Sequence, residues 1–245
     1  MPRTIIVGDV HGCAGELDDL LSALTYRPGH DRLVLVGDLV ARGPDSVGVV
    51  ERVAEYEAEG VRGNHDEKVL QWWRVFRSEG RKAADRAVKL SARHREVVES
   101  LKRRHFERLE ALPLVLPLPD HGASVVHAGV DPSLGPAKSA PDTLITARSV
   151  DEEGRVTHKL AGAPWASRWR GPEHLVFGHD ARRGLQLEPF ATGLDTGCVY
   201  GRHLSALVLD RCQPVPADPD ARAGLVARVP ARLTYVPPGA GDGPE

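Results

Sequence analysis

Short apolar segments alternate with glycine-rich turns and amphipathic segments over the first 66 residues of the chain. The apolar segments are rich in isoleucine, leucine and valine, which is typical of buried strands, and the amphipathic segments repeat apolar residues at helical spacing. In chain order the pattern first predicts a strand at 4–7, a turn at 8–12 and a helix at 16–24. The same unit then repeats as a strand at 32–36, a turn at 37–44 and a helix at 45–59, and a third strand begins at 60–62. This alternation predicts an α/β sheet that binds ligands at the carboxyl ends of its strands.

A different pattern occupies residues 67–111, where apolar residues recur at helical spacing throughout. Apolar segments typical of strands return after Pro113, at 114–118, 124–127, 175–177, around 194 and at 204–209. We therefore expect a single domain over residues 1–245 that carries a helical cap inserted at about 67–111. The chain ends in a tail rich in proline and glycine, and we expect its last residues, 237–245, to be disordered.

The whole chain is nearly balanced in charge, whereas the predicted cap is strongly basic. The sequence holds 32 lysines and arginines against 34 aspartates and glutamates, and this balance argues against a stable nucleic-acid complex. Between Arg74 and Arg108 there are 12 basic and 5 acidic residues, which leaves a net charge of +7. A basic excess confined to one inserted segment could attract a polyanion, and the alternative is an ordinary solvated helix face.

No feature of the sequence points to export or to a membrane. Three cysteines without a Cys-x-x-Cys spacing argue against a disulfide framework and for a reducing compartment. The first apolar run, Ile5–Val7, is too short for a signal peptide, and no stretch approaches the roughly 20 apolar residues of a membrane span. We therefore expect a cytoplasmic protein with no membrane partner.

Polar residues flanked by glycine follow five of the predicted strands. The motifs are Gly8-Asp9-Val10-His11-Gly12, Gly37-Asp38 through Arg42-Gly43, Gly63-Asn64-His65-Asp66, His127-Ala128-Gly129 and Gly178-His179. Each motif alone has a simpler interpretation, as a turn, a helix cap or a polar residue at a strand end. Together they offer carboxylate, amide and imidazole ligands at neighbouring strand ends, and Asp38 could bridge two ions with its two oxygens. The combined pattern predicts a site for two metal ions.

In these motifs the chain resembles the metallophosphoesterase superfamily, and within it the phosphoprotein-phosphatase branch. The family pattern GDxHG, GDxxxRG, GNHD/E, HA/GG and a later GH is matched from Gly8 to about Gly201, which is most of the chain. The resemblance implies a four-layer α/β/β/α sandwich, two sheets flanked by helices, with a dinuclear metal site. The ions are expected to be manganese, with cobalt, magnesium, iron or zinc as alternatives.

The same resemblance implies a role for each residue of the motifs. Metal one would take Asp9, His11 and Asp38, and metal two would take Asp38, Asn64, His127 and His179. His65 would be the general acid near the leaving group, and Arg42 would bind phosphate oxygens. We add Arg148 as a second phosphate ligand, because two planar guanidinium groups can clamp one phosphoryl group. The alternative for Arg148 is an ordinary surface salt bridge.

Three stretches narrow the resemblance to the bacterial symmetrical diadenosine tetraphosphate hydrolases: GDLVARGP at 37–44, GNHD at 63–66 and LDTGCVYG at 194–201. The expected function is hydrolysis of a dinucleoside polyphosphate to two nucleoside diphosphates, by in-line attack of a hydroxide that bridges the two metals. One alternative is a protein serine/threonine phosphatase of the same superfamily. A more distant one is a non-catalytic, metal-stabilised module that binds a polyanion.

Ala41 departs from the pattern of the protein phosphatases, which have an aspartate there that partners the catalytic histidine. Without that carboxylate, His65 would give less acid assistance, which suits a weakly basic leaving group such as a nucleoside diphosphate. Ala41 therefore favours a phosphoanhydride substrate. The alternative is that Asp66 or Asp195 takes the place of the missing partner.

Two adjacent tryptophans, Trp72 and Trp73, stand at the start of the predicted cap. Packing in the hydrophobic core is the expected role of either residue taken alone. The alternative is that one of them stacks on an adenine.

Overall fold

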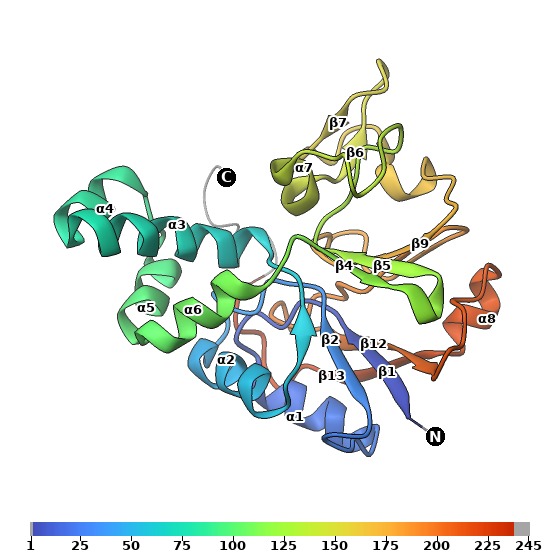
Figure 1. The fold of residues 1–245 in the computed structure, drawn as a ribbon, viewed down its shortest axis with the longest axis horizontal. Helices are drawn as coiled ribbons and strands as arrows, with labels where there is room; N and C mark the ends of the chain where they lie inside the picture. The colour runs from blue at the N-terminus through green and yellow to red at the C-terminus, as the bar shows by residue number, and fades with distance from the viewer. Residues whose placement is uncertain (1, 238–245) are drawn as a thin grey trace.

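The computed structural model describes residues 2–237, which form three sheets (Figure 1). The first sheet runs in the order β13 (Val226–Pro230), β12 (His203–Asp210), β1 (Arg3–Val7), β2 (Arg32–Leu35) and β3 (Glu59–Gly60). The second runs β10 (Gln186–Glu188), β11 (Ala191–Gly193), β9 (His174–Phe177), β5 (Ala123–Val126) and β4 (Val115–Leu118). The small third sheet runs β7 (Val156–Thr157), β6 (Ser149–Val150) and β8 (Ala163–Pro164). Most of the tail that was predicted to be disordered, residues 238–245, lies outside the described residues.

Eight α-helices and two 3₁₀ turns connect the strands of the described chain. The helices are α1 (Ala14–Ala23), α2 (Ser46–Glu55), α3 (Asn64–Glu79), α4 (Arg81–Ala87), α5 (Ala92–Ser100), α6 (Arg103–Ala111), α7 (Pro141–Thr146) and α8 (Pro219–Ala223), and the turns are η1 (Pro119–His121) and η2 (Trp165–Ser167). Helices α3–α6 follow one another without a strand and extend to the left of the sheets in Figure 1. Within the part of the chain that the structure describes, no helix combines the length and apolar character needed to cross a membrane.

Each large sheet contains three adjacent parallel strands, which form one side of the first sheet and the centre of the second. In the first sheet β1, β2 and β3 are parallel, with Ile5 opposite Leu33 and Leu35 opposite Gly60. In the second sheet β5, β9 and β11 are parallel, while β4 and β10 pair antiparallel at the edges. The strand–helix–strand pattern of residues 4–62 predicts the parallel part of the first sheet, and the structure confirms it. The carboxyl ends of the parallel strands therefore gather at one edge of each sheet.

Alternation of side chains along the strands produces a layered molecule. On β1, Ile5 and Val7 pack in the core beside α1 and α2, whereas Ile6 lies in the core between the two sheets. On β5, Val125 belongs to that same central core, and Val126 faces the opposite way, toward Trp165 of η2. Helices, two sheets and an outer layer of α7 and η2 thus form the four-layer α/β/β/α sandwich that the resemblance implies.

Candidate metal centre

Five loops bring the polar motifs to one edge of the two packed sheets. The loops follow β1, β2 and β3 of the first sheet and β5 and β9 of the second, so each motif lies at the carboxyl end of a strand. Most of the predicted site side chains are buried, namely Asp9, His11, Asp38, His65, His127 and His179. The others are half-buried, namely Asn64, Arg42 and Arg148. The site is therefore assembled from both sheets and is largely shielded from solvent.

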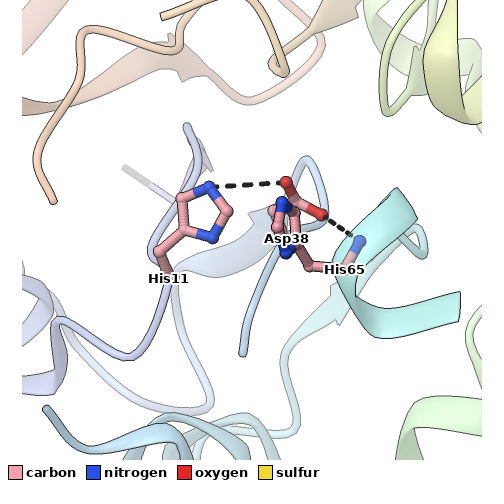
Figure 2. Close-up of side chains that lie close together, drawn as sticks. All are labelled: His11, Asp38 and His65. Atoms are coloured by element: carbon pink, nitrogen blue, oxygen red, sulfur yellow. Dashed lines mark hydrogen bonds and ion pairs between the residues drawn. The ribbon is translucent and has the colours of Figure 1, made fainter. Parts of the chain in front are cut away.

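Asp38 lies at the centre of the site. Its Oδ2 is 3.4 Å from Nε2 of His11, its Oδ1 is 3.5 Å from Nε2 of His127, and the backbone N–H of His65 donates to Oδ1 at 3.0 Å. Figure 2 shows the carboxylate of Asp38 between His11 and the start of α3. Gly63 makes this approach possible, because a Cβ there would lie 2.0 Å from Oδ1 of Asp38. The two carboxylate oxygens therefore face different imidazoles, as a bridging ligand would.

Two groups of donor atoms share Asp38, and each could hold a metal ion. One is His11, Asp38 and His65, and the other is Asp38, His127 and His179; within each group the donor atoms lie within 4.8 Å of one another. Asn64 joins the second group, since its Oδ1 is 3.1 Å from Nε2 of His127 and 3.0 Å from Nδ1 of His179. Nε2 of His179 is buried and has no hydrogen-bond partner among the described residues. Carboxylate, amide and imidazole donors suit a divalent ion, so this donor set fits the predicted metals.

Asp9 lies beside these groups rather than within either of them. Both of its carboxylate oxygens accept the backbone N–H of His179, at 3.1 and 3.0 Å. A Cβ on Gly178 would lie 1.8 Å from Oδ1 of Asp9, so glycine is needed for this contact. Asp9 thus ties the loop after β1 to the loop after β9, in addition to the ligand role with His11 and Asp38 that the resemblance implies.

Buried charges of opposite sign hold the site together. Burial alone would raise the pKa of Asp38, but the imidazoles of His127, His65 and His11 outweigh burial and hold that pKa well below its ordinary value. Burial alone would lower the pKa of His127, but Asp38 outweighs it and raises the pKa to about 10. A positive charge is therefore stabilised beside Asp38, and a metal ion bound there would displace the proton of His127.

Arg42 lies in the loop after β2 of the first sheet, and Arg148 lies between α7 and β6 of the small third sheet. The Arg42 guanidinium donates to the hydroxyl of Tyr200 and lies 5.6 Å from the centre of its ring. Burial, and the Arg42 charge to a smaller extent, lower the pKa of His65, while burial and the charges of His127 and Arg148 lower that of His179. Both positive charges thus disfavour protonation of histidines at the site. Nη1 of Arg148 also donates to the backbone oxygen of His158 at 3.3 Å.

The ring of His65 meets another histidine of the cap segment. Its Nδ1 is 2.9 Å from Nε2 of His94, which lies on α5. The two carboxylates offered as partners are engaged elsewhere. Asp66 accepts the backbone N–H groups of Leu39, Val40 and Gly63, and Asp195 accepts that of Gly197. These contacts do not support the alternative that Asp66 or Asp195 is the partner of the His65 ring.

Sequence reasoning also missed three residues that support the predicted ones. His94 contacts His65, Tyr200 holds Arg42, and Arg183 donates to the backbone oxygen of Arg148 at 3.1 Å. In the sequence His94 stands between two arginines, in a charged segment that predicts an exposed helix. It also lacks the flanking glycine of the other site motifs. Tyr200 lies in the LDTGCVYG stretch, so that motif could have indicated it as a site residue.

The tryptophans and the basic residues of the cap have structural partners. Trp72 and Trp73 are buried, and the Trp73 ring lies parallel to Phe106 with centroids 4.3 Å apart, so core packing is the correct interpretation. The structure pairs several cap arginines with acidic groups, among them Arg93 with Glu96, Arg95 with Asp85, Arg103 with Glu107 and Arg104 with Glu51. These pairs favour a solvated helix face over a polyanion-binding surface.

A sandwich of two sheets with histidine, aspartate and asparagine ligands at its strand ends defines a metallophosphoesterase, a class of metal-dependent hydrolases. The family model for calcineurin-like phosphoesterases matches residues 2–183, and the chain belongs to that family. A solved structure provisionally named as a diadenosine tetraphosphatase is 38% identical to the chain, with a TM-score of 0.78, and the match covers 94% of this chain and 96% of that one. A protein serine/threonine phosphatase from Saccharomyces cerevisiae shares the fold at 16% identity, with a TM-score of 0.54 and coverage of 97% and 82%.

Curated relatives carry the name of a related enzyme with a different cleavage position. The asymmetrical bis(5'-nucleosyl)-tetraphosphatase PrpE of Oceanobacillus iheyensis is 29% identical over 217 residues, which cover 82% of this chain and 86% of that protein. Its namesake from Halalkalibacterium halodurans is 30% identical over 220 residues, covering 82% and 88%. These names do not support the symmetrical cleavage expected from the sequence.

Proposed function

We propose that the protein is a dinuclear-metal hydrolase that cleaves dinucleoside polyphosphates, with diadenosine tetraphosphate as the representative substrate. The observation that carries the proposal is the sharing of Asp38 between two groups of buried donors. The substrate class rests on the names of the relatives described above. The names of the two curated relatives favour asymmetrical cleavage, to one nucleoside triphosphate and one nucleoside monophosphate, over cleavage to two diphosphates.

Each site residue has a part in this proposal. Asp9, His11 and Asp38 would hold one divalent ion, manganese by expectation, and Asp38, Asn64, His127 and His179 would hold the second. When bound, such ions neutralise phosphate charge and lower the pKa of water.

The other residues act on the phosphate and on the departing group. Arg42 and Arg148 bind non-bridging oxygens and stabilise the charge that develops on them. His65 donates a proton or a hydrogen bond to the leaving oxygen. Asp9 keeps the loop after β9, and with it His179, against the loop after β1.

A product analysis tests the proposal directly. Purified protein with added Mn²⁺ is incubated with diadenosine tetraphosphate, and in parallel with a phosphoserine peptide, and the products are separated by ion-exchange chromatography. We expect ATP and AMP from the dinucleotide and slower release of phosphate from the peptide. Two molecules of ADP would contradict the cleavage position, and faster hydrolysis of the peptide would favour the serine/threonine phosphatase. No turnover of either substrate would favour the non-catalytic module.

A further inference from the structure

His65 and His94 form a contact between two buried imidazoles that the proposed reaction does not yet use. Their facing nitrogens, Nδ1 of His65 and Nε2 of His94, are 2.9 Å apart, whereas the ring centroids are 4.9 Å apart. The ring planes differ by only 3°. Nitrogens closer than the centroids, in parallel planes, place the rings edge to edge, which is the geometry of an N–H···N hydrogen bond. The contact therefore fixes the orientation of the His65 ring.

His94 is itself held on its far side. Its Nδ1 lies 2.8 Å from Oγ of Ser91, the residue that caps α5, and the backbone N–H of His94 donates to the same oxygen at 3.4 Å. His94 is 5% exposed, and Val97 and Val98 on the same helix are buried in the core. The helix and its capping serine thus leave the His94 ring little freedom to turn away from His65.

The hydrogen bonds that link Ser91, His94 and His65 are consistent with one set of hydrogen positions. Oγ of Ser91 accepts the His94 backbone N–H, and it can then either donate its own hydrogen to Nδ1 of His94 or accept a hydrogen from that nitrogen with its second lone pair; we take the first arrangement. A neutral His94 that accepts at Nδ1 carries its hydrogen on Nε2 and donates it to Nδ1 of His65. A neutral His65 that accepts at Nδ1 must then carry its own hydrogen on Nε2. That nitrogen is the one left to serve the site, where the His65 ring lies 5.0 Å from the ring of His11.

We propose that His94 is a positioning residue for His65, which aims the ring and fixes its hydrogen on Nε2, where it can hydrogen-bond the leaving oxygen. The proposal rests on the proposed role of His65 at the leaving oxygen. His65 thus has an imidazole partner from α5, whereas Ala41 supplies no carboxylate. A neutral imidazole can donate a hydrogen bond from Nε2 without losing its proton, and a phosphoanhydride leaving group needs no more than this because it departs as a weakly basic anion.

A double-mutant cycle tests this role. His65→Ala, His94→Ala and the double variant are compared with the unmodified protein, with kcat and KM measured on diadenosine tetraphosphate and on p-nitrophenyl phosphate. Loss of a partner that orients a functional group costs about 10- to 100-fold, so we expect that loss in kcat for His94→Ala, with little change in KM. We expect no further loss when His94→Ala is added to His65→Ala, because the two residues act as one unit.

Two further variants separate positioning from a structural role. His94→Gln retains an amide N–H that can donate to Nδ1 of His65, so it should recover most of the lost kcat. His105→Ala is the control, because His105 is also buried in the cap segment, on α6, and accepts the N–H of Lys102 rather than contacting His65. Equal losses for His94→Ala and His105→Ala, or losses that add to that of His65→Ala, would overturn the proposal.

A measurement without turnover completes the test. Nitrogen-15 NMR of histidine-labelled protein reports which ring nitrogen of His65 carries hydrogen. We expect hydrogen on Nε2 in the unmodified protein and a mixture of tautomers in His94→Ala. An unchanged tautomer in His94→Ala would contradict the role of His94 even if diadenosine tetraphosphate is cleaved. Suppose that diadenosine tetraphosphate is not cleaved, while the double-mutant cycle measured on p-nitrophenyl phosphate still shows the expected non-additive losses. That result would refute only the proposed function.

Discussion

At the scale of single residues, Arg42 depends on an unusual backbone and on one distant side chain. Ala41 and Arg42 both have φ of 71°, in the left-handed region that residues other than glycine rarely adopt. The next residue, Gly43, donates its N–H to the backbone oxygen of His11 at 2.8 Å, and a Cβ there would lie 2.2 Å from that oxygen. This contact joins the first two motifs, and Tyr200 then receives the Arg42 guanidinium.

The Arg42–Tyr200 pair leads to a prediction on catalysis. Arg42→Ala should lower kcat/KM for the dinucleotide by about 10²-fold, as for loss of one donor to a developing oxyanion. Tyr200→Phe keeps the ring beneath the guanidinium and removes only the hydroxyl, so its loss should be clearly smaller. Steady-state kinetics at saturating Mn²⁺ measure both. Arg211→Ala, at an exposed position after β12, is the control. An equal loss in kcat/KM for Arg211→Ala would contradict the proposed role of Arg42.

At the scale of elements, aromatic packing joins the helices of the cap. Phe106 of α6 is 2% exposed and packs against Trp73 of α3, while Trp72 packs against Phe76 and donates its Nε1–H to Asp85 of α4. Helix α5, which carries His94, packs on α3. The position of His94 beside His65 therefore depends on how these helices pack.

Phe106→Ala should lower the free energy of unfolding by about 3–5 kcal/mol, the usual cost of truncating a buried phenylalanine. The physical reason is the loss of apolar burial together with the cavity left against Trp73. Urea denaturation followed by tryptophan fluorescence measures the change. Phe76→Ala is the matched control, since Phe76 is 37% exposed and should cost much less. Equal costs would show that Phe106 is not an anchor of the cap.

His174 on β9 leads to a prediction on acid stability. Burial, with a smaller contribution from the Arg222 charge, lowers its pKa to about 3, and its Nε2 lies 2.9 Å from Oγ1 of Thr192. Between the unfolded value near 6.5 and this folded value, the unfolded chain binds a proton that the folded protein does not. The free energy of unfolding therefore falls as the pH falls through that window, by up to about 1.4 kcal/mol per pH unit for this one group.

His174→Gln should weaken this dependence, because glutamine can keep a hydrogen bond to Thr192 without gaining a charge. Urea denaturation of both proteins at several pH values from 7 to 4, with metal absent, measures the two slopes. His203→Gln, at an exposed position of β12, is the control for the loss of one histidine. Identical slopes for His174→Gln and the unmodified protein would contradict the prediction.

At the scale of the whole molecule, the site joins the two sheets. His11 and Asp38 come from loops of the first sheet, and His127 and His179 come from loops of the second. Oδ1 of Asp38 already faces His127 across this boundary at 3.5 Å. Metal ions that use both sets of ligands would therefore link the two central layers of the sandwich.

Metal binding should accordingly stabilise the whole fold. Mn²⁺ at 100 times its Kd should raise the free energy of unfolding by about 2.7 kcal/mol for one site, and a chelator should reverse the rise and abolish turnover. Differential scanning calorimetry with and without Mn²⁺ measures the shift in Tm, and elemental analysis gives the metal content. Asp38→Asn should lose the bound metal, the Tm shift and the activity. A variant that keeps two ions and near-normal turnover would contradict the bridging role of Asp38.

The local parts of the fold and the site could be predicted because each depends on residues close together in the chain. Strands such as Arg3–Val7 and Arg32–Leu35 follow from apolar runs that end in glycine, and the parallel sheet follows from the helices between them. The motifs at strand ends indicated metal ligands for the same reason. What brought these motifs to a common edge was the topology of the sheets, which alternation of strands and helices makes predictable.

Contacts between distant parts of the chain were decided by tertiary packing alone. Nothing near His94 in the sequence indicates that a turn of α5 will bring its ring to His65. Asp66 and Asp195 stand inside the motifs and so are the more obvious candidates, but they accept backbone N–H groups instead. Likewise, Arg42 reaches Tyr200 across 158 positions, and Asp9 meets the backbone of His179 across 170. The sequence by itself determined the chemical groups and the strand ends that carry them. Tertiary structure decided which group faces which, because a hydrogen bond requires the two atoms within about 3 Å, and only the packing of helices and sheets sets such distances.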